Sequence, residues 1–201
     1  EAVFPWRDTK DVFNISLGSP LSEEPLVKTA LEILSIGEEA VDINEISAVL
    51  LSPYFAGSDE EYLSLARLDA TLKKEGRLIV SLAGVGRAID RNKISSLSGF
   101  RKRLDNWLKA LGESRKRELP SRWSEKISTL LKNVEFPSKR FTLTSSEYQV
   151  LKGWNGLLEG LASLDDVLGQ INRSEAVSYL IKMAGETIHQ SESEECPIQV
   201  L

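Results

Sequence analysis

The chain has 201 residues, 41% of them hydrophobic, and a formal net charge of −5. This length and apolar content suit one globular domain with a buried core, or one domain with fragments of another. No apolar run reaches transmembrane length and no signal peptide is visible, and the single Cys excludes an internal disulfide, so we expect a reducing, cytoplasmic location.

The first predicted elements are a strand, a turn and a helix. Apolar and polar residues alternate over residues 12–17, which predicts a short strand, and Gly18-Ser19-Pro20 predicts the turn that ends it. Ser22 is the predicted N-cap of a helix that ends near Gly37. At the opposite end of the chain, residues 197–201 predict a second short strand.

Apolar residues at helical spacing predict the elements between these ends. Six further helices are expected, over residues 43–51, 58–76, 97–111, 121–133, 144–168 and 174–189. Their predicted caps are Asp42, the pair Ser58 and Glu61, and the pair Thr144 and Glu147. The fold class is therefore mainly α: a multi-helix domain with two short strands near the termini.

Residues 77–92 fit both a strand and a helix. Leu78-Ile79-Val80 has the branching of a strand, whereas the later apolar residues have helical spacing. Gly84 and Gly86 do not form a phosphate loop, because a third glycine, a following Lys-Ser or Lys-Thr and a clean strand-to-helix context are missing. The glycines are expected to interrupt a helix.

Charge is divided unevenly along the chain. Residues 67–140 hold 19 Lys or Arg and 8 Asp or Glu, a balance of +11, whereas all other residues together hold 6 and 22, a balance of −16. A chain divided in this way commonly has one surface that faces a polyanion or an acidic partner.

The basic middle carries the candidate DNA-binding residues, which are expected to point outward from two helices and from the linker between them. They are Arg101, Lys102, Arg103, Lys109, Arg115, Lys116, Arg117, Arg122 and Lys126. If the two helices pack antiparallel, the clusters come close together and can neutralise several phosphates. Binding of that kind is strongly salt-dependent and independent of DNA sequence.

Two other interpretations of the basic residues stay open. They are ordinary solvated helix faces with Glu113, Glu118 and Glu125 nearby, or they dock on acidic parts of a larger protein. The tryptophans on these helices and the next, at positions 107, 123 and 154, lie in phase with aliphatic stripes, so we expect them in the core rather than as platforms for base stacking.

Catalytic and metal sites are not predicted. A Walker A motif is missing, and one His with one Cys cannot build the usual zinc sites. His189 is expected to be a surface or cap residue, and Cys196 structural or incidental. The remaining carboxylates that could hold Mg²⁺ are expected to form a solvated acidic face; they are Asp165, Asp166, Glu192, Glu194 and Glu195.

Three short segments resemble parts of UvrD-type superfamily-one helicases of the RecB/AddB kind, including the family called probable DNA repair protein. The first is the predicted strand, turn and helix with Pro25-Leu26 and Ala30-Leu31-Glu32-Ile33-Leu34, which resembles the region after motif IV. Leu51-Ser52-Pro53-Tyr54 resembles the start of an inserted 2B-like subdomain. Cys196-Pro197-Ile198-Gln199-Val200-Leu201 resembles the strand that begins motif V.

The resemblance implies a division of the chain into three parts. Residues 1–37 would be a strand-turn-helix fragment of a motor domain, residues 38–195 the inserted helical subdomain, and residues 196–201 the strand that returns to the motor. The two terminal strands would then pair in parallel. A start at Glu1 rather than Met fits a piece of a longer protein or a processed chain.

The function implied by the resemblance is that of a non-catalytic subdomain that positions or gates DNA in a repair helicase or exonuclease. ATP and Mg²⁺ would be needed only by the parent protein, and the partners would be DNA and the rest of that protein. The alternative is a helical protein-interaction domain without a direct DNA contact. An independent hydrolase is a more distant third.

Overall fold

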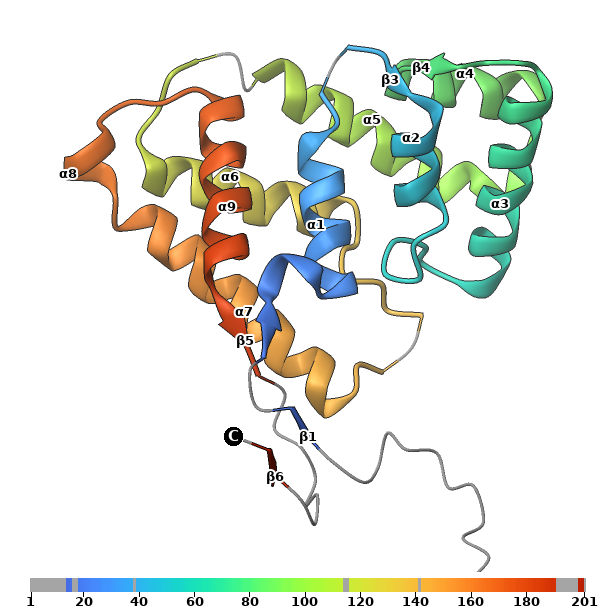
Figure 1. The fold of residues 1–201 in the computed structure, drawn as a ribbon. Coiled ribbons are helices and arrows are strands. Elements are labelled where there is room, and N and C mark those ends of the chain that lie inside the picture. Colours follow the sequence, from blue (N-terminus) through green and yellow to red (C-terminus); the bar gives the residue numbers. More distant parts are fainter. Residues whose placement is uncertain are drawn as a thin grey trace, which may run out of the picture.

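The computed structural model of the chain describes residues 14–15, 18–37, 39–113, 116–140, 142–190 and 199–200. Within these residues the chain forms nine α-helices and six two-residue strands, which confirms a mainly α fold (Figure 1). The helices are α1 (Pro25–Ser35), α2 (Ile43–Leu50), α3 (Asp59–Lys74), α4 (Leu82–Arg91), α5 (Ser98–Glu113), α6 (Pro120–Asn133), α7 (Ser145–Ala162), α8 (Asp165–Leu168) and α9 (Arg173–Glu186).

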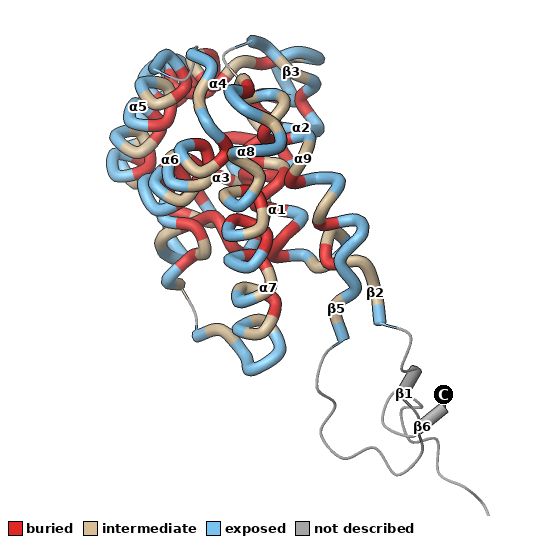
Figure 2. Tube along the Cα trace, turned by 90° about the vertical axis from the view of Figure 1, so that its left-hand side faces the viewer, coloured by how far each residue is buried: buried red, intermediate tan, exposed pale blue. Residues whose placement is uncertain are grey.

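Helix α1 is the centre of the packing. Seven of its eleven residues are buried, because the helix is apolar on most of its circumference. It contacts α2, α6, α7 and α9, and so joins the helices near the chain ends to the helices of the middle. Buried residues from helices throughout the chain form one continuous core, and the exposed residues lie on its outside (Figure 2).

Short strands join segments that are far apart in the sequence. Strands β1 (Asn14–Ile15) and β6 (Gln199–Val200) pair in parallel, which confirms the predicted pairing of the two end strands. Strands β2 (Ser19–Pro20) and β5 (Ile188–His189) pair antiparallel, and we refer to this pair as the stem. Both pairs lie at the same end of the molecule (Figure 1).

Residues 77–92 form both of the elements that their sequence allows. Strand β4 (Ile79–Val80) pairs antiparallel with β3 (Val41–Asp42), and α4 follows one residue later with Ser81 as its N-cap. The expectation that glycines interrupt a helix here is wrong, since α4 runs through Gly84 and Gly86. A Cβ on Gly86 would lie 3.3 Å from Cζ of Arg101 on α5, so the glycine permits close packing of the two helices.

Several predicted helix ends are confirmed. The Asp42 carboxylate accepts a hydrogen bond from the Asn44 N–H at the start of α2. Thr144 and Glu147 form the predicted capping box of α7. Ser58 caps α3, but the Glu61 carboxylate accepts from the Gly57 N–H instead of completing a box with Ser58.

Other predicted helix ends are wrong. Ser22 lies in a 3₁₀ turn, η2 (Leu21–Glu23), and α1 begins three residues later at Pro25. Its last carbonyls, those of Leu34 and Ile36, accept hydrogen bonds from the Arg173 guanidinium of α9, so a distant side chain caps this end instead of Gly37. The long helix expected over residues 144–168 is divided into α7 and α8.

Candidate nucleic-acid interface

Helix α5 carries four of the nine candidate residues, and the structure places them in different surroundings. Phe100, Leu104 and Trp107 face the core, which fixes the orientation of the helix. Lys102 and Lys109 lie on the exposed side, as predicted. No hydrogen bond or ion pair joins either lysine to another described residue.

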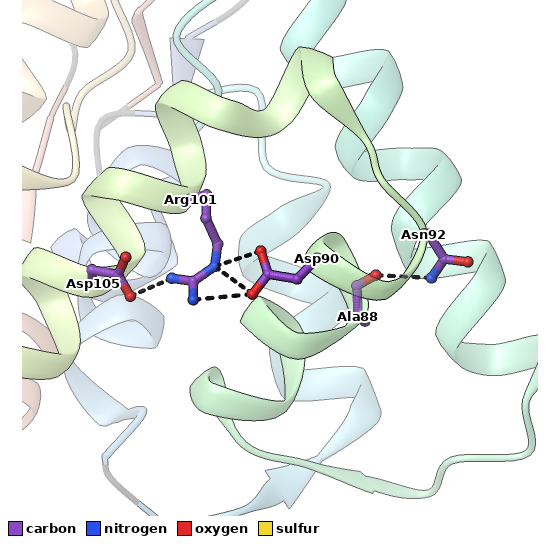
Figure 3. Close-up of polar contacts among 5 residues, drawn as sticks. All are labelled: Ala88, Asp90, Asn92, Arg101 and Asp105. Atoms are coloured by element: carbon purple, nitrogen blue, oxygen red, sulfur yellow. Dashed lines mark hydrogen bonds and ion pairs between the residues drawn. The ribbon is translucent and has the colours of Figure 1, made fainter.

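Arg101 is held between two carboxylates (Figure 3). Its Nε lies 3.1 Å from Oδ1 of Asp90 on α4, and Nη1 also contacts Oδ1 of Asp105 on the next turn of α5. These hydrogen bonds, with Asp105 contributing most, raise the pKa of the arginine. Arg101 is thus partly neutralised before any phosphate approaches.

Arg103 does not point outward, which corrects the prediction made from the sequence. Its side chain is only 12% exposed, and the guanidinium contacts Glu61 on α3 and Glu135 after α6, with 3.0 Å between Nη1 and Oε2 of Glu135. It also lies 5.8 Å from the centre of the Phe100 ring. The reason is tertiary, because the buried Glu61 carboxylate needs a cationic partner.

The candidates in the linker between α5 and α6 also differ in their surroundings. Arg115 lies outside the described residues, and Lys116 is exposed without a partner among them. Arg117 donates a hydrogen bond of 2.8 Å to the Gln170 carbonyl and lies 3.3 Å from Glu175 of α9. The guanidinium therefore ties the linker to the loop before α9.

Arg122 and Lys126 lie one turn apart on α6. Arg122 contacts Glu125 at 2.9 Å, and both side chains are exposed. Lys126 lies 2.5 Å from Glu118 and 5.2 Å from the centre of the Trp123 ring. Of the nine candidates, Lys102, Lys109 and Lys116 are thus the described ones that have no partner within the described chain.

The tryptophans are core residues, as predicted. Trp107 and Trp123 are each 1% exposed and Trp154 is 2% exposed. The Trp123 indole N–H donates to the Ile171 carbonyl at 2.8 Å, so its polar atom is also used within the fold. None of these three rings can stack on a base without unfolding its surroundings.

Only some of the carboxylates considered for Mg²⁺ lie within the described residues. Asp165 accepts hydrogen bonds from the backbone N–H and the hydroxyl of Ser121, and so joins α8 to the start of α6. Glu192, Glu194 and Glu195 lie outside the described residues, as does Cys196. Within the described residues, no group of three or more His, Cys, Asp or Glu side chains is arranged to hold a metal ion.

His189 is neither an exposed residue nor a helix cap. It lies in β5, opposite Ser19 of β2, and is half-buried in the stem. Hydrophobic periodicity could not predict this position, because a strand of two residues is too short to show a pattern.

Two structural features were not predicted: the Glu61–Arg103–Glu135 cluster and the capping of α1 by Arg173. The paired members are 32 or more residues apart in the sequence, so no local pattern could reveal them. In the described part of the chain, no helix is both long and apolar enough to cross a membrane.

Comparison with protein-family models, curated proteins and solved structures found no significant match.

Proposed function

We propose that the chain is a non-catalytic helical subdomain, inserted in a larger cytoplasmic DNA repair protein of the RecB/AddB-like helicase or exonuclease kind, where it positions or gates DNA. The observation that carries the proposal is the pairing of β1 with β6 beside the stem. Chain segments leading into and out of the helical body run next to each other there.

Parallel strands require a crossover connection, and the whole helical body forms it here. A two-residue parallel pair has too few hydrogen bonds to be stable alone, and parallel strands occur almost entirely in larger sheets covered on both faces. β1 and β6 are therefore well suited to be neighbouring strands in the sheet of another domain. This arrangement of the two end strands agrees with the sequence resemblance, whereas α1, which the resemblance assigns to the first motor-domain fragment, packs at the centre of the helical body.

The DNA-facing part of the proposal rests on the lysines that lack partners. Lys102 and Lys109 are seven residues apart and share the exposed side of α5, and Lys116 follows the helix. An unpaired lysine can neutralise a phosphate without first breaking an ion pair. ATP and Mg²⁺ would be bound by the parent protein, since this subdomain would only hold its substrate.

A protein-interaction domain without DNA contact is the second candidate function. The observation that favours it is the internal pairing of Arg101, Arg103, Arg117, Arg122 and Lys126. Each of these cations has carboxylates nearby that compete with phosphate. The basic middle is consequently much less positive at its surface than its composition suggests.

Fluorescence anisotropy with labelled single-stranded, duplex and forked DNA tests the proposal. Lys102, Lys109 and Lys116 would be changed together to Glu, and the control protein would carry Lys28→Glu, Lys139→Glu and Lys152→Glu, which change the charge equally at other exposed positions. We expect the first variant to lose about tenfold or more in affinity, with a log affinity against log salt slope shallower by about 2 to 3. The control should lose about twofold or less.

Circular dichroism of both variants checks that the fold is intact. Equal losses in the two variants would mean that only net charge matters, and would contradict a DNA surface on α5. No binding by the unchanged protein at low salt would also contradict it, and would favour the protein-interaction domain.

A further inference from the structure

A groove of about 500 Å³ runs over α1, between α2 and α9, and it has no role in the proposed DNA surface. We refer to it as the α1 groove. The residues that line it are Ser22, Lys28, Leu31, Glu32, Ser35, Asn44, Glu45, Ala48 and Ile181. The three helices lie next to one another on one side of the molecule in Figure 1.

The apolar part of the α1 groove consists of Leu31, Ala48 and Ile181. Leu31 belongs to the core edge at 8% exposure, whereas Ile181 on α9 is 45% exposed. Burying Ile181 against a partner is favourable, because it removes apolar surface from water. An open groove with an apolar anchor on one wall is a common feature of surfaces that bind helices.

Short side chains keep the α1 groove open. Ser22, Ser35 and Ala48 are part of its lining, and Gly185 follows Ile181 by one turn of α9. A Cβ on Gly185 would lie 3.9 Å from Oγ of Ser22, so this wall is built from small residues. Small residues let a docked backbone approach the helices closely.

The charged part of the α1 groove is mainly acidic. The carboxylates of Glu32 and Glu45 have no hydrogen bond or ion pair with any described residue. Burial raises the pKa of Glu32, and the nearby Lys28 only partly opposes the shift. A cationic group from a partner would compensate for this desolvation.

The lining of the α1 groove carries a small net negative charge, because its charged residues are Glu32, Glu45 and Lys28. The charged pair near Ile181, Lys182 and Glu186, lies at 3.9 Å and is neutral in sum. Charge complementarity at the α1 groove therefore favours a positively charged ligand over nucleic acid.

We infer that the α1 groove binds a basic amphipathic helix of a partner protein. Apolar side chains of that helix would pack on Leu31 and Ile181, and its Lys or Arg side chains would pair with Glu32 and Glu45. The site is independent of the DNA surface, because it lies on other helices and takes a ligand of the opposite charge.

Model peptides test the site directly on the whole chain. A labelled helical peptide of about 16 residues, with leucines at helical i, i+3, i+4 and i+7 spacing and lysines elsewhere, is compared with the same peptide carrying Glu for Lys. A third peptide has the composition of the first, with its leucines scattered around the helix. We expect the basic amphipathic peptide to bind about tenfold or more tightly than either of the others.

Variants with matched controls locate the binding. Ile181→Asp should weaken the basic peptide about tenfold, whereas Val167→Asp, at a residue that is 77% exposed on α8, should not weaken it. Glu32→Gln with Glu45→Gln should weaken it about fivefold, whereas Glu60→Gln with Glu159→Gln should change it less than about twofold. Equal binding of the acidic or scattered peptide, or equal effects of the groove and control variants, would overturn the proposal.

Discussion

Helix α5 and the α1 groove differ in a way that their sequences do not reveal. α5 belongs to the strongly basic middle of the chain, yet Arg101 and Arg103 each contact two carboxylates. The α1 groove holds fewer charges, but no hydrogen bond or ion pair joins the carboxylates of Glu32 and Glu45 to another described residue, and Glu32 has only Lys28 nearby. The comparison shows that the charge available to a ligand depends on pairing within the fold rather than on the number of charged residues.

The two arginines of α5 also differ in how much their ion pairs contribute to stability. Arg103 and Glu61 are 12% and 9% exposed, so each desolvated charge depends on the other. Arg101 is 28% exposed and its partners are more than half exposed, so water competes with those ion pairs. Variants of these two residues and of the α1 groove test the comparison.

The largest effect is expected from Arg103→Met, which keeps an apolar stem but leaves the buried Glu61 carboxylate without its cation. The free energy of unfolding should fall by about 3 kcal/mol, measured by urea denaturation. Adding Glu61→Gln should recover part of the loss, since the unpaired charge is then removed. A fall of less than about 1 kcal/mol would mean that Arg103 is not a buried structural ion-pair partner.

A smaller effect is expected from Arg101→Met. Its ion pairs with Asp90 and Asp105 are largely solvated, so the free energy of unfolding should fall by about 0.5 to 1 kcal/mol. The difference should shrink when urea denaturation is repeated in about 1 M NaCl, because salt screens exposed charges. A loss as large as that of Arg103→Met, at either salt concentration, would remove the distinction between the two arginines.

The smallest effect is expected from Glu32→Gln in the α1 groove. Because burial raises the pKa of Glu32 above its ordinary value of 4.5 in the folded state, ionisation of Glu32 lowers stability as pH rises from that value through the folded pKa. Glu32→Gln should therefore slightly increase the free energy of unfolding at pH 7. It should leave it unchanged at about pH 3, where Glu32 is protonated in both states.

Thermal unfolding of the unchanged protein and of Glu32→Gln, between about pH 3 and pH 7, measures the difference in their stability. Glu159→Gln, at an exposed position of α7, is the control and should show no such pH dependence. A lower stability of Glu32→Gln at pH 7 would mean that the ionised carboxylate is stabilised in the folded state, contrary to the desolvated groove described above.

The sequence predicted those features that depend on neighbouring residues. The seven expected helices are present, with α7 and α8 sharing one of them, and the caps at Asp42 and Thr144 are as expected. Helix α4 was missed because the intrinsic penalty of Gly84 and Gly86, about 1 kcal/mol each, is outweighed by packing on α5. The end of α1 lies close to the predicted Gly37, but Gly37 is not its cap, because the capping side chain, Arg173, comes from another helix.

The nine candidate DNA-binding residues also show that the sequence predicts position along a helix but not tertiary surroundings. Their positions on α5, on α6 and between them follow from periodicity, but their exposure and pairing do not. Lys102 and Lys109 are exposed as predicted, whereas the Arg103 side chain is only 12% exposed. The α1 groove was not predicted at all, since Ile181 on α9 is distant in the sequence from the rest of its lining.

By itself the sequence determined most of the helical segments, α4 excepted, and the apolar face of each of these helices, because an apolar stripe and a cap act within a few turns. Only the tertiary structure decided which charges are free. Asp90 is 11 residues from Arg101, and Glu61 is 42 residues from Arg103. Such partners meet only after the helices pack, and burial then decides whether each pair is a solvated contact or a structural ion pair.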